Sequence, residues 1–326
     1  MDYGRCWRHG KRGNQEPSDA YCILCVAVSY NTLGQRDHRM AYHHAGGDIV
    51  HRSVPPVVFP LSIGAISMYP IAVIQIRLGS TRLPGKGLMP LVGHPMLWHL
   101  VQRVRSVPGL ADVVVATSTN PSDQPIRDFC VLEGLPCFSG SEHDVLDRIY
   151  RAALHFHADP VVRILGDCPL VDPGLIARVL AMLRTGQYDL VGVATGAGAL
   201  HIQEYRFPDG LDAEAMTRDA LATTWGLATS VADREHVSIY MCREPETFRV
   251  GRIVADADYR HMRWTVDYAE DYLFVKDIYE ALWQEAKHFT YQDVLAWLKA
   301  HPEAEARNRR YVGQEGYEEL WQGDKG

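Results

Sequence analysis

The stretch QIRLGSTRLPGK (Gln75–Lys86) follows directly on an apolar run, IAVI at positions 71–74. An uninterrupted apolar run of this kind is typical of a strand that is buried on both faces of a sheet. After the loop, apolar residues repeat with the spacing of one helical face: Leu97, Leu100, Val101 and Val104. The stretch therefore predicts a strand, a basic loop and a helix in succession, as in a parallel α/β sheet.

The loop also carries the groups of an anion-binding site. It holds Arg77, Arg82 and Lys86, and no Asp or Glu occurs between positions 49 and 111, although the whole chain has a net charge of -7. Gly79 and Gly85 allow backbone N–H groups to approach an anion closely. The spacing is neither that of a P-loop nor that of a dinucleotide-binding loop. A polyphosphate suits these cations best, although an ordinary solvated surface loop has a similar composition.

The order of residues in the loop resembles a family signature. Q-x-R-x-G-S-T-R-L-P-G-K is similar to the signature loop of cytidylyltransferases that activate sugar acids. The closest resemblance is to the family of spore coat polysaccharide biosynthesis protein F, which is related to the CMP-ketodeoxyoctulosonate and CMP-acylneuraminate synthetases. The resemblance implies an α/β fold with a mostly parallel sheet and helices on both faces, of the nucleotide-diphospho-sugar transferase (GT-A-like) type. It also implies a nucleotidyltransferase that moves CMP from CTP to a sugar or sugar acid and releases pyrophosphate.

Composition narrows the class of protein. The chain has 326 residues, of which 47% are hydrophobic and 22% charged, as in soluble globular proteins. A pI of about 6.1 argues against a general nucleic-acid binder. Seven cysteines without framework spacing indicate reduced thiols and a cytoplasmic protein. The apolar span 54–76 contains four prolines that would break a helix, so no membrane span is expected there.

Three segments are expected along the chain. Residues 1–67 lack any sustained helical or strand period and are predicted to be an N-terminal extension, disordered or a mis-assigned start before Met68. Cys22 and Cys25 within it form a single CxxC, which is a weak indication of zinc. Residues 68–300 are predicted to form the nucleotidyltransferase domain, and residues 301–326 a peripheral tail.

The predicted domain alternates strands and helices. Strands are expected at 71–76, 113–117, 161–165, 190–193, 248–254 and 263–266. Helices are expected at 95–107, 125–133, 142–157, 174–184, 218–228, 233–242, 269–284 and 291–300, the third of them capped by Ser141. Ligands of such sheets bind at the carboxyl ends of the strands, so the loops that follow the strands hold the candidate site.

Two of these loops end in carboxylates. Asp167 follows the apolar strand 161–165, where an unpaired charge is costly to bury, so a hard cation is a natural partner. Asp267 ends the segment R-W-T-V-D and could equally cap the helix after it. The resemblance favours Asp167 and Asp267 as the ligands of a magnesium ion. Leu165 stands where the octulosonate branch has Gln, which leaves the sugar preference open.

Other loops carry candidate contacts for the base and for the acceptor. Thr117 and Ser118 could be turn and capping residues, and the resemblance favours them as contacts on the cytosine side. Asp209 and Asp212, in the segment P-D-G-L-D, can accept hydrogen bonds from sugar hydroxyls. The resemblance adds Arg234 and His236 to the candidate contacts for the acceptor. Arg234 is a candidate partner for a substrate carboxylate, and His236 is a sugar contact, a proton acceptor or a structural residue.

The roles implied by the resemblance are as follows. The catalytic residues are Arg77, Lys86 and Asp167, and the expected partners are CTP and a small sugar or sugar acid, with a homodimer as the assembly. The nucleotide is expected to contact Gln75, Arg77, Gly79, Ser80, Arg82, Lys86, Thr117 and Ser118. Two other functions stay open: a glycosyltransferase that uses Asp256-Ala257-Asp258 as a D-x-D metal site, and a non-catalytic nucleotide-binding protein.

Overall fold

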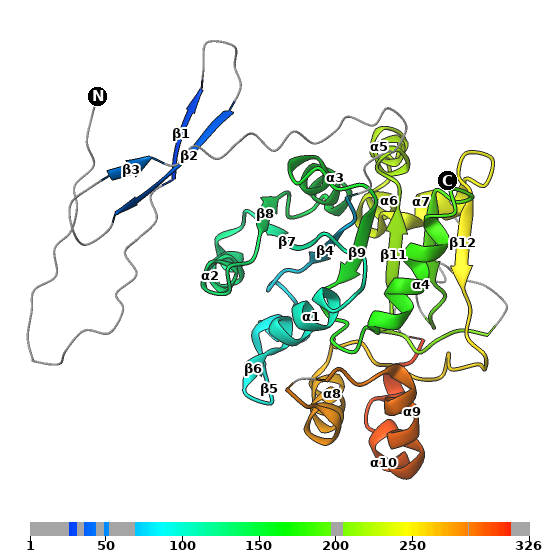
Figure 1. Ribbon diagram of the computed structural model, residues 1–326. Coiled ribbons are helices and arrows are strands. Elements are labelled where there is room, and N and C mark those ends of the chain that lie inside the picture. Colours follow the sequence, from blue (N-terminus) through cyan, green and yellow to red (C-terminus); the bar gives the residue numbers. More distant parts are fainter. Residues whose placement is uncertain are drawn as a thin grey trace, which may run out of the picture. The chain divides into compact units, whose positions relative to one another are not determined.

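The computed structural model describes residues 26–30, 36–43, 49–51, 69–196, 205–285 and 287–313 (Figure 1). The chain divides into two compact units, Met1–Ile66 and Ser67–Gly326. In the first unit, three strands form an antiparallel sheet: β1 (Val26–Tyr30), β2 (Arg36–His43) and β3 (Ile49–His51). Cys22 and Cys25 lie outside the described residues, so the zinc alternative stays untested. Within the described ranges, no helix has the length and apolar character needed to cross a bilayer.

The second unit is built on a seven-stranded sheet with the order β12-β10-β11-β9-β4-β7-β8. Its neighbours are parallel except where β11 pairs antiparallel with β9 and β10. The predicted, mostly parallel sheet is therefore confirmed. The strands are β4 (Ile71–Gln75), β7 (Asp112–Ser118), β8 (Cys137–Gly140), β9 (Val161–Leu165), β10 (Leu190–Val193), β11 (Ala213–Met216) and β12 (Val250–Ile253).

Strand β4 occupies the middle of this sheet and explains why its sequence is apolar throughout. It pairs in parallel with β7 on one side and with β9 on the other. Ala72 and Ile74 point into one hydrophobic cluster, and Ile71 and Val73 point into a second cluster on the opposite face. Because the carboxyl ends of β4, β7 and β9 meet at one edge, the loops that follow them are brought together there.

Helices cover both faces, as predicted. The cluster around Ala72 and Ile74 takes residues from α1, α2, α4, α8 and α9, whereas that around Ile71 and Val73 takes residues from α3, α5 and α7. The helices are α1 (Met96–Arg105), α2 (Gln124–Leu132), α3 (Val145–His155), α4 (Pro173–Leu183), α5 (Arg218–Leu227), α6 (Val231–His236), α7 (Ser238–Arg243), α8 (Ala269–Leu282), α9 (Tyr291–Ala300) and α10 (Pro302–Glu305).

Three sequence predictions about these elements are wrong. Helix α3 is capped by Asp144, whose side chain accepts from the N–H of Asp147, and Ser141 accepts from the N–H of Asp144 one turn earlier. The single helix expected at 233–242 is split into α6 and α7 because Val237 has a φ of 61°. Among the described residues, the expected strand 263–266 has a single bridge, from Arg263 to Asp209; the N–H of Trp264 bonds to the Asp209 carbonyl, whereas the N–H of Val266 bonds to the Asp167 carbonyl in another loop.

Short elements complete the loop and the C-terminal segment. A 3-10 helix, η1 (Lys86–Leu88), follows the basic loop, and Gly85 before it has a φ of 73°. A small hairpin of β5 (Pro90–Leu91) and β6 (His94–Pro95) leads into α1. After α10, a last 3-10 helix is formed by η3 (Arg309–Tyr311).

Candidate active site

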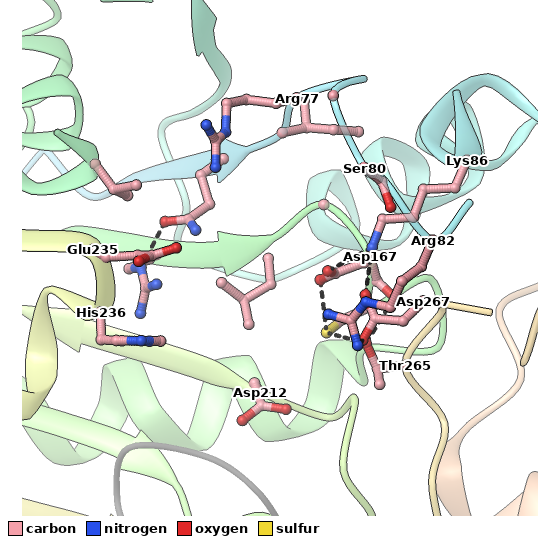
Figure 2. Close-up of a pocket in the computed structure, with 18 of the residues that line it drawn as sticks. Arg77, Ser80, Arg82, Lys86, Asp167, Asp212, Glu235, His236, Thr265 and Asp267 are labelled. Atoms are coloured by element: carbon pink, nitrogen blue, oxygen red, sulfur yellow. Dashed lines mark hydrogen bonds and ion pairs between the residues drawn. The ribbon is translucent and has the colours of Figure 1, made fainter. Parts of the chain in front are cut away.

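A cavity of about 440 Å³ opens at the carboxyl ends of β4 and β9 (Figure 2). Much of its wall comes from the residues that the sequence predicted. They are Gln75, Arg77, Gly79, Ser80, Arg82, Lys86, Asp167, Asp209, Asp212, His236 and Asp267. The cavity thus brings together the basic loop, the carboxylates of Asp167 and Asp267, and three of the four predicted acceptor residues.

Lys86 links the carboxylates of Asp167 and Asp267. Its Nζ lies 2.9 Å from Asp167 Oδ2 and 2.9 Å from Asp267 Oδ1, and it donates to the carbonyl of Val266 at 2.7 Å. Only 8% of Lys86 is exposed. Burial lowers the pKa of Lys86, but the two carboxylates raise it more, so the net shift is upward. The ammonium is therefore charged and neutralises part of the acid pair.

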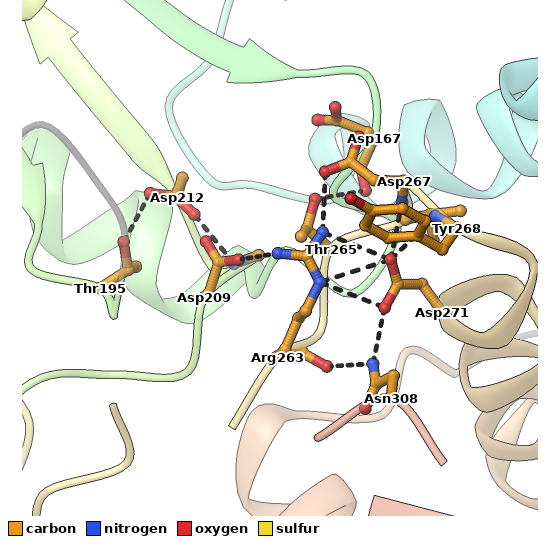
Figure 3. A network of polar contacts seen from close by, with 12 residues as sticks. Asp167, Thr195, Asp209, Asp212, Arg263, Thr265, Asp267, Tyr268, Asp271 and Asn308 are labelled. Atoms are coloured by element: carbon orange, nitrogen blue, oxygen red, sulfur yellow. Dashed lines mark hydrogen bonds and ion pairs between the residues drawn. The ribbon is translucent and has the colours of Figure 1, made fainter. Parts of the chain in front are cut away.

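Asp267 is fixed from behind by Arg263 (Figure 3). Arg263 is buried, and its Nη2 lies 2.8 Å from Asp267 Oδ2, its Nη1 3.3 Å from Asp209 Oδ2 and its Nε 3.2 Å from Asp271 Oδ1. Burial raises the pKa of Asp267, and the charges of Lys86, Arg82 and Arg263 lower it further than burial raises it. Asp267 therefore stays ionised and its orientation is set by the guanidinium group.

The acid pair fits a magnesium ion only if a ligand supplies further oxygens. In the described part of the chain, no group of three or more His, Cys, Asp or Glu side chains is arranged to hold a metal. Two carboxylates completed by substrate phosphates and water are a common magnesium environment. Asp167 and Asp267 present oxygen donors of the right kind at the cavity wall, so the residues fit the predicted ion.

The predicted acceptor loop lies against the same wall. Asp212 accepts from Thr195 Oγ1 at 2.6 Å and from the N–H of Gly210 at 2.9 Å, and burial raises its pKa to about 6. Gly210 has a φ of 98°, and a Cβ there would lie 2.4 Å from the backbone N of Thr265. Only a glycine at position 210 therefore allows the acceptor loop to pack this closely against the segment that ends at Asp267.

A second polar cluster lies away from the acid pair. Arg163 Nε donates to Gln75 Oε1 at 2.8 Å, and its Nη1 lies 2.9 Å from Glu214 Oε2. Glu214 also accepts from Ser238 Oγ at 2.6 Å. The pKa of His236 is lowered, first by burial and then by the charge of Arg163. The imidazole is therefore a neutral hydrogen-bonding group at this end of the cavity.

Arg77 does not point toward Lys86. Its Nη1 donates to the carbonyl oxygen of Glu142 at 2.8 Å, and Figure 2 shows its guanidinium group turned away from Arg82 and Lys86. Arg82 lies on the acid-pair side, where its Nη1 donates to Tyr268 Oη at 3.2 Å and lies 3.9 Å from Asp267 Oδ2. The predicted phosphate role of Arg77 stays a prediction.

Three predicted residues lie outside the set that lines the cavity. Thr117 and Ser118 are fully buried, and Ser118 donates to Asp123, which also accepts from the N–H of Leu78 at 2.7 Å. Asp123 thereby ties the second loop to the basic loop. Arg234 Nε donates to Asp144 Oδ2 at 2.7 Å, and its Nη1 donates to two backbone carbonyls. The base-side and carboxylate-binding roles of these residues stay predictions.

The sequence analysis missed several residues of the site. Arg148 and Arg163 line the cavity, and Arg263 and Asn308 support it from behind. Arg163 interrupts an apolar strand, and Arg148 falls three residues after Val145 on the apolar face of α3. A charged residue within an apolar pattern was therefore the signal that could have identified Arg148 and Arg163 from the sequence. The contact of Asn308 with Arg263 joins residues too far apart in sequence to be inferred from a local pattern.

The chain resembles known proteins along most of its second unit. The cytidylyltransferase family model matches residues 71–314. Spore coat polysaccharide biosynthesis protein SpsF of Bacillus subtilis is 30% identical over 239 residues, which are 71% of this chain and 95% of SpsF. A 3-deoxy-manno-octulosonate cytidylyltransferase of Nitratidesulfovibrio vulgaris is 37% identical over 142 residues, which are 42% of this chain and 54% of that enzyme.

The fold has a solved counterpart. The structure of a cytidylyltransferase from Leptospira borgpetersenii has a TM-score of 0.66 and 26% identity, and the match covers 73% of this chain and 97% of that one. The match to SpsF extends over nearly the whole of that protein, whereas the match to the octulosonate enzyme covers about half of it. The resemblance first indicated by the loop Gln75–Lys86 is confirmed: the chain belongs to the cytidylyltransferase family.

Proposed function

We propose that this protein transfers CMP from CTP to a hydroxyl group of a sugar or sugar acid and releases pyrophosphate. The acceptor oxygen attacks the α-phosphorus, and the bond between the α- and β-phosphates breaks. One observation carries the proposal: Lys86 lies between the carboxylates of Asp167 and Asp267, beside a basic glycine loop. The names of SpsF and of the octulosonate cytidylyltransferase support surface or spore coat polysaccharide biosynthesis as the setting.

The basic loop would bind the phosphates directly, and the acid pair would bind them through a magnesium ion. Arg82, Lys86 and the hydroxyl group of Ser80 line one side of the cavity, and we assign them to the β- and γ-phosphates. Asp167 and Asp267 would hold magnesium, which when bound neutralises phosphate charge and so favours attack. Arg263 would keep Asp267 oriented throughout, because its guanidinium group is buried and fixed by three carboxylates.

The glycosyltransferase alternative has less support. Its candidate D-x-D pair, Asp256 and Asp258, is not among the residues that line the cavity. Asp258 instead pairs with Arg260, with Oδ2 2.6 Å from Nε. A non-catalytic nucleotide-binding protein would not need two carboxylates from different segments of the chain at the same point. We also propose that the protein works as a cytoplasmic homodimer, which sedimentation of the purified protein would test.

The reaction is tested by pyrophosphate release. The protein would be incubated with magnesium, each of CTP, ATP, GTP and UTP, and a panel of sugar acids and neutral sugars. We expect release with CTP and with one class of acceptor. Formation of a free nucleoside diphosphate from a nucleotide sugar would identify a glycosyltransferase, and binding of CTP without turnover across the panel would favour the non-catalytic alternative.

Substitution of Asp167 separates binding from chemistry. Asp167→Asn keeps the shape of the side chain but removes the charge, so we expect CTP binding to change little and turnover to fall at least about a hundredfold. Asp256→Asn, which alters the alternative metal pair, is the matched control and should turn over normally. Normal turnover by Asp167→Asn would remove the metal assignment.

A further inference from the structure

Arg82 is an exposed cation that an aromatic side chain holds in place. It lines the cavity, and its side chain is 47% exposed. Its Nη1 donates to Tyr268 Oη at 3.2 Å, and its Cζ lies 5.1 Å from the centroid of the Tyr268 ring. The carboxylate of Asp267 is more distant, with Oδ2 3.9 Å from Nη1. Tyr268 therefore makes the closest polar contact of the Arg82 side chain among the described residues.

Tyr268 is itself fixed by the C-terminal segment. Its ring stacks on the ring of Tyr311, with centroids 3.8 Å apart and planes 4° from parallel. Tyr311 Oη donates to Glu270 Oε2 at 3.1 Å, in the first turn of α8. The backbone N–H of Tyr268 donates to Asp271 Oδ2 at 3.0 Å in the same turn. The phenol ring that contacts Arg82 is thus held between the start of α8 and the last described turn of the chain.

A second arginine contacts the same pair of rings. Arg310 Cζ lies 4.8 Å from the centroid of the Tyr311 ring, and its Nη2 donates to Tyr311 Oη at 2.7 Å. Arg310 also pairs with Glu270, which keeps the last turn attached to α8. Guanidinium groups are attracted to the faces of aromatic rings. Each ring of the stack therefore carries one cation.

The stack can act on a nucleotide only through its neighbours. Tyr268 and Tyr311 are not among the residues that line the cavity, so an effect on a ligand has to pass through Arg82 or through Asp267. An exposed arginine on a loop loses rotamer freedom when it binds a phosphate, and this loss weakens binding. Contact with Tyr268 restricts Arg82 before the ligand arrives. The hydrogen bond uses one of the five guanidinium donors and leaves others for a phosphate.

We propose that Tyr268 and Tyr311 are positioning residues that hold Arg82 ready for the β- and γ-phosphates of the nucleotide. The inference rests on the proposed function, in which Arg82 contacts these phosphates, and it extends the nucleotide site to the C-terminal segment. Tyr268 supplies the contact with the guanidinium group, and Tyr311 supplies the surface against which Tyr268 is held.

The test compares two nucleotides that differ only in these phosphates. The Kd for CTP and the Kd for CMP would be measured by calorimetry with magnesium and without acceptor. In Arg82→Met we expect CTP to bind about tenfold more weakly, because a charge-assisted contact is lost. In Tyr311→Leu we expect a weakening of about threefold to fivefold for CTP. CMP lacks both phosphates, so its Kd should change by less than about twofold in either variant.

A double variant tests whether Tyr311 acts through Arg82. These two side chains share Tyr268 as a partner, so Tyr311→Leu should weaken CTP binding by less than about twofold more once Arg82 is already Met. Tyr311→Phe keeps the ring and should bind CTP like wild type. Tyr268→Phe keeps the stack but removes the hydroxyl group that accepts from Arg82, so it should weaken CTP binding about twofold to threefold.

The matched control is Tyr69→Leu. Tyr69 is a half-exposed tyrosine that precedes β4, and the substitution should leave both Kd values unchanged. Thermal unfolding would show that each variant is folded.

The outcomes separate this proposal from the proposed function. An unchanged CTP affinity in folded Tyr311→Leu, an equal loss for CTP and CMP, or independent effects of Arg82 and Tyr311 would each overturn the positioning role and leave the cytidylyltransferase proposal standing. A lower kcat with an unchanged Kd for CTP would assign the stack to Asp267 instead and would also overturn it. An absence of CTP binding by wild type would contradict the proposed function itself.

Discussion

Lys86 allows two carboxylates to lie close together at the cavity wall. Asp167 and Asp267 would repel each other without a cation, and the ammonium group lies 2.9 Å from each. A magnesium ion bound by the same two carboxylates would compete with this ammonium group for their charge. Lys86 therefore stabilises the free protein, and it would also weaken metal binding before the nucleotide arrives.

Substitution of Lys86 should reveal this competition. In Lys86→Met we expect the affinity for Mg²⁺ in the absence of nucleotide to rise about tenfold, and stability without metal to fall by about 3 kcal/mol because the cation that contacts both carboxylates is lost. Thermal unfolding at increasing Mg²⁺ concentrations measures both effects. Lys276→Met, which removes an exposed lysine paired with Glu280 on α8, is the control. Equal Mg²⁺ responses of the Lys86 variant and wild type would contradict the competition.

Asp212 should make stability depend on pH. Burial raises its pKa from 3.8 to about 6, so between these values the folded protein binds more protons than the unfolded chain. The free energy of unfolding should therefore fall as pH rises through this window, by about 1.4 kcal/mol for each pH unit between the unfolded and the folded pKa. The destabilisation caused by ionised Asp212 reaches its full size above about pH 6, and it is absent at pH values below 3.8, the pKa in the unfolded chain.

Asp212→Asn tests the assignment. Urea unfolding at several pH values between about 4 and 7 should show the variant gaining stability relative to wild type as pH rises. Asp128→Asn, at an exposed position of α2, is the matched control. A constant difference for Asp212→Asn would mean that another group carries the pH dependence.

At the scale of secondary structure, the pattern of the sequence predicted the central elements well. Strands β4, β9 and β10 and helix α9 lie where periodicity placed them, because each is either buried on both faces or carries one apolar stripe. The failures have local causes. Strand β11 has the sequence AEAM, in which Ala and Glu are residues that strands disfavour. Its extended conformation is stabilised by pairing with β9 and β10. Val237 adopts a positive φ, which is rare for a β-branched residue, so the break between α6 and α7 could not be predicted from the sequence.

The C-terminal segment contributes to the site, which its sequence did not indicate. Asn308 is buried and donates to the carbonyl of Arg263 at 2.8 Å and to Asp271 Oδ1 at 2.9 Å. Tyr311 stacks on Tyr268, with ring centroids 3.8 Å apart, and Tyr268 accepts a hydrogen bond from Arg82. The last described helical turn therefore supports both the acid pair and the basic loop. Such contacts follow from the tertiary fold and leave no periodic signal.

Asn308→Ala should affect stability and turnover together. The substitution removes the amide donor from the Arg263 carbonyl and from Asp271 Oδ1, which keeps its contact with Arg263 Nε, so we expect a loss of about 1–3 kcal/mol in the free energy of unfolding. We also expect a lower kcat with little change in CTP affinity, because Arg263 orients Asp267. Arg309→Ala, at the exposed next position, is the control for both measurements. An Asn308 variant as active and as stable as wild type would show that the segment is peripheral, as the sequence suggested.

At the scale of the whole molecule, the described residues of the site all come from the second unit. The described members of both hydrophobic clusters begin at Ile71, and the cavity is lined from Gln75 onward. The family match likewise spans residues 71–314. The expectation of a separate extension over residues 1–67 rests on the lack of a helical or strand period there, and it stays a prediction. The sequence could not predict the three short strands described there, since their residues form no alternating pattern.

Removal of residues 1–67 tests whether the first unit matters for folding or binding. A variant that starts at Met68 keeps β4 and both clusters, so we expect its Tm to stay within about 2 °C of the full chain and its CTP affinity to be unchanged. The matched control is a variant that lacks residues 1–75, which removes the central strand β4 and should not fold. If the Met68 variant aggregates or loses CTP binding while the full chain does not, the first unit is part of the functional protein. The prediction of a dispensable extension would then be wrong.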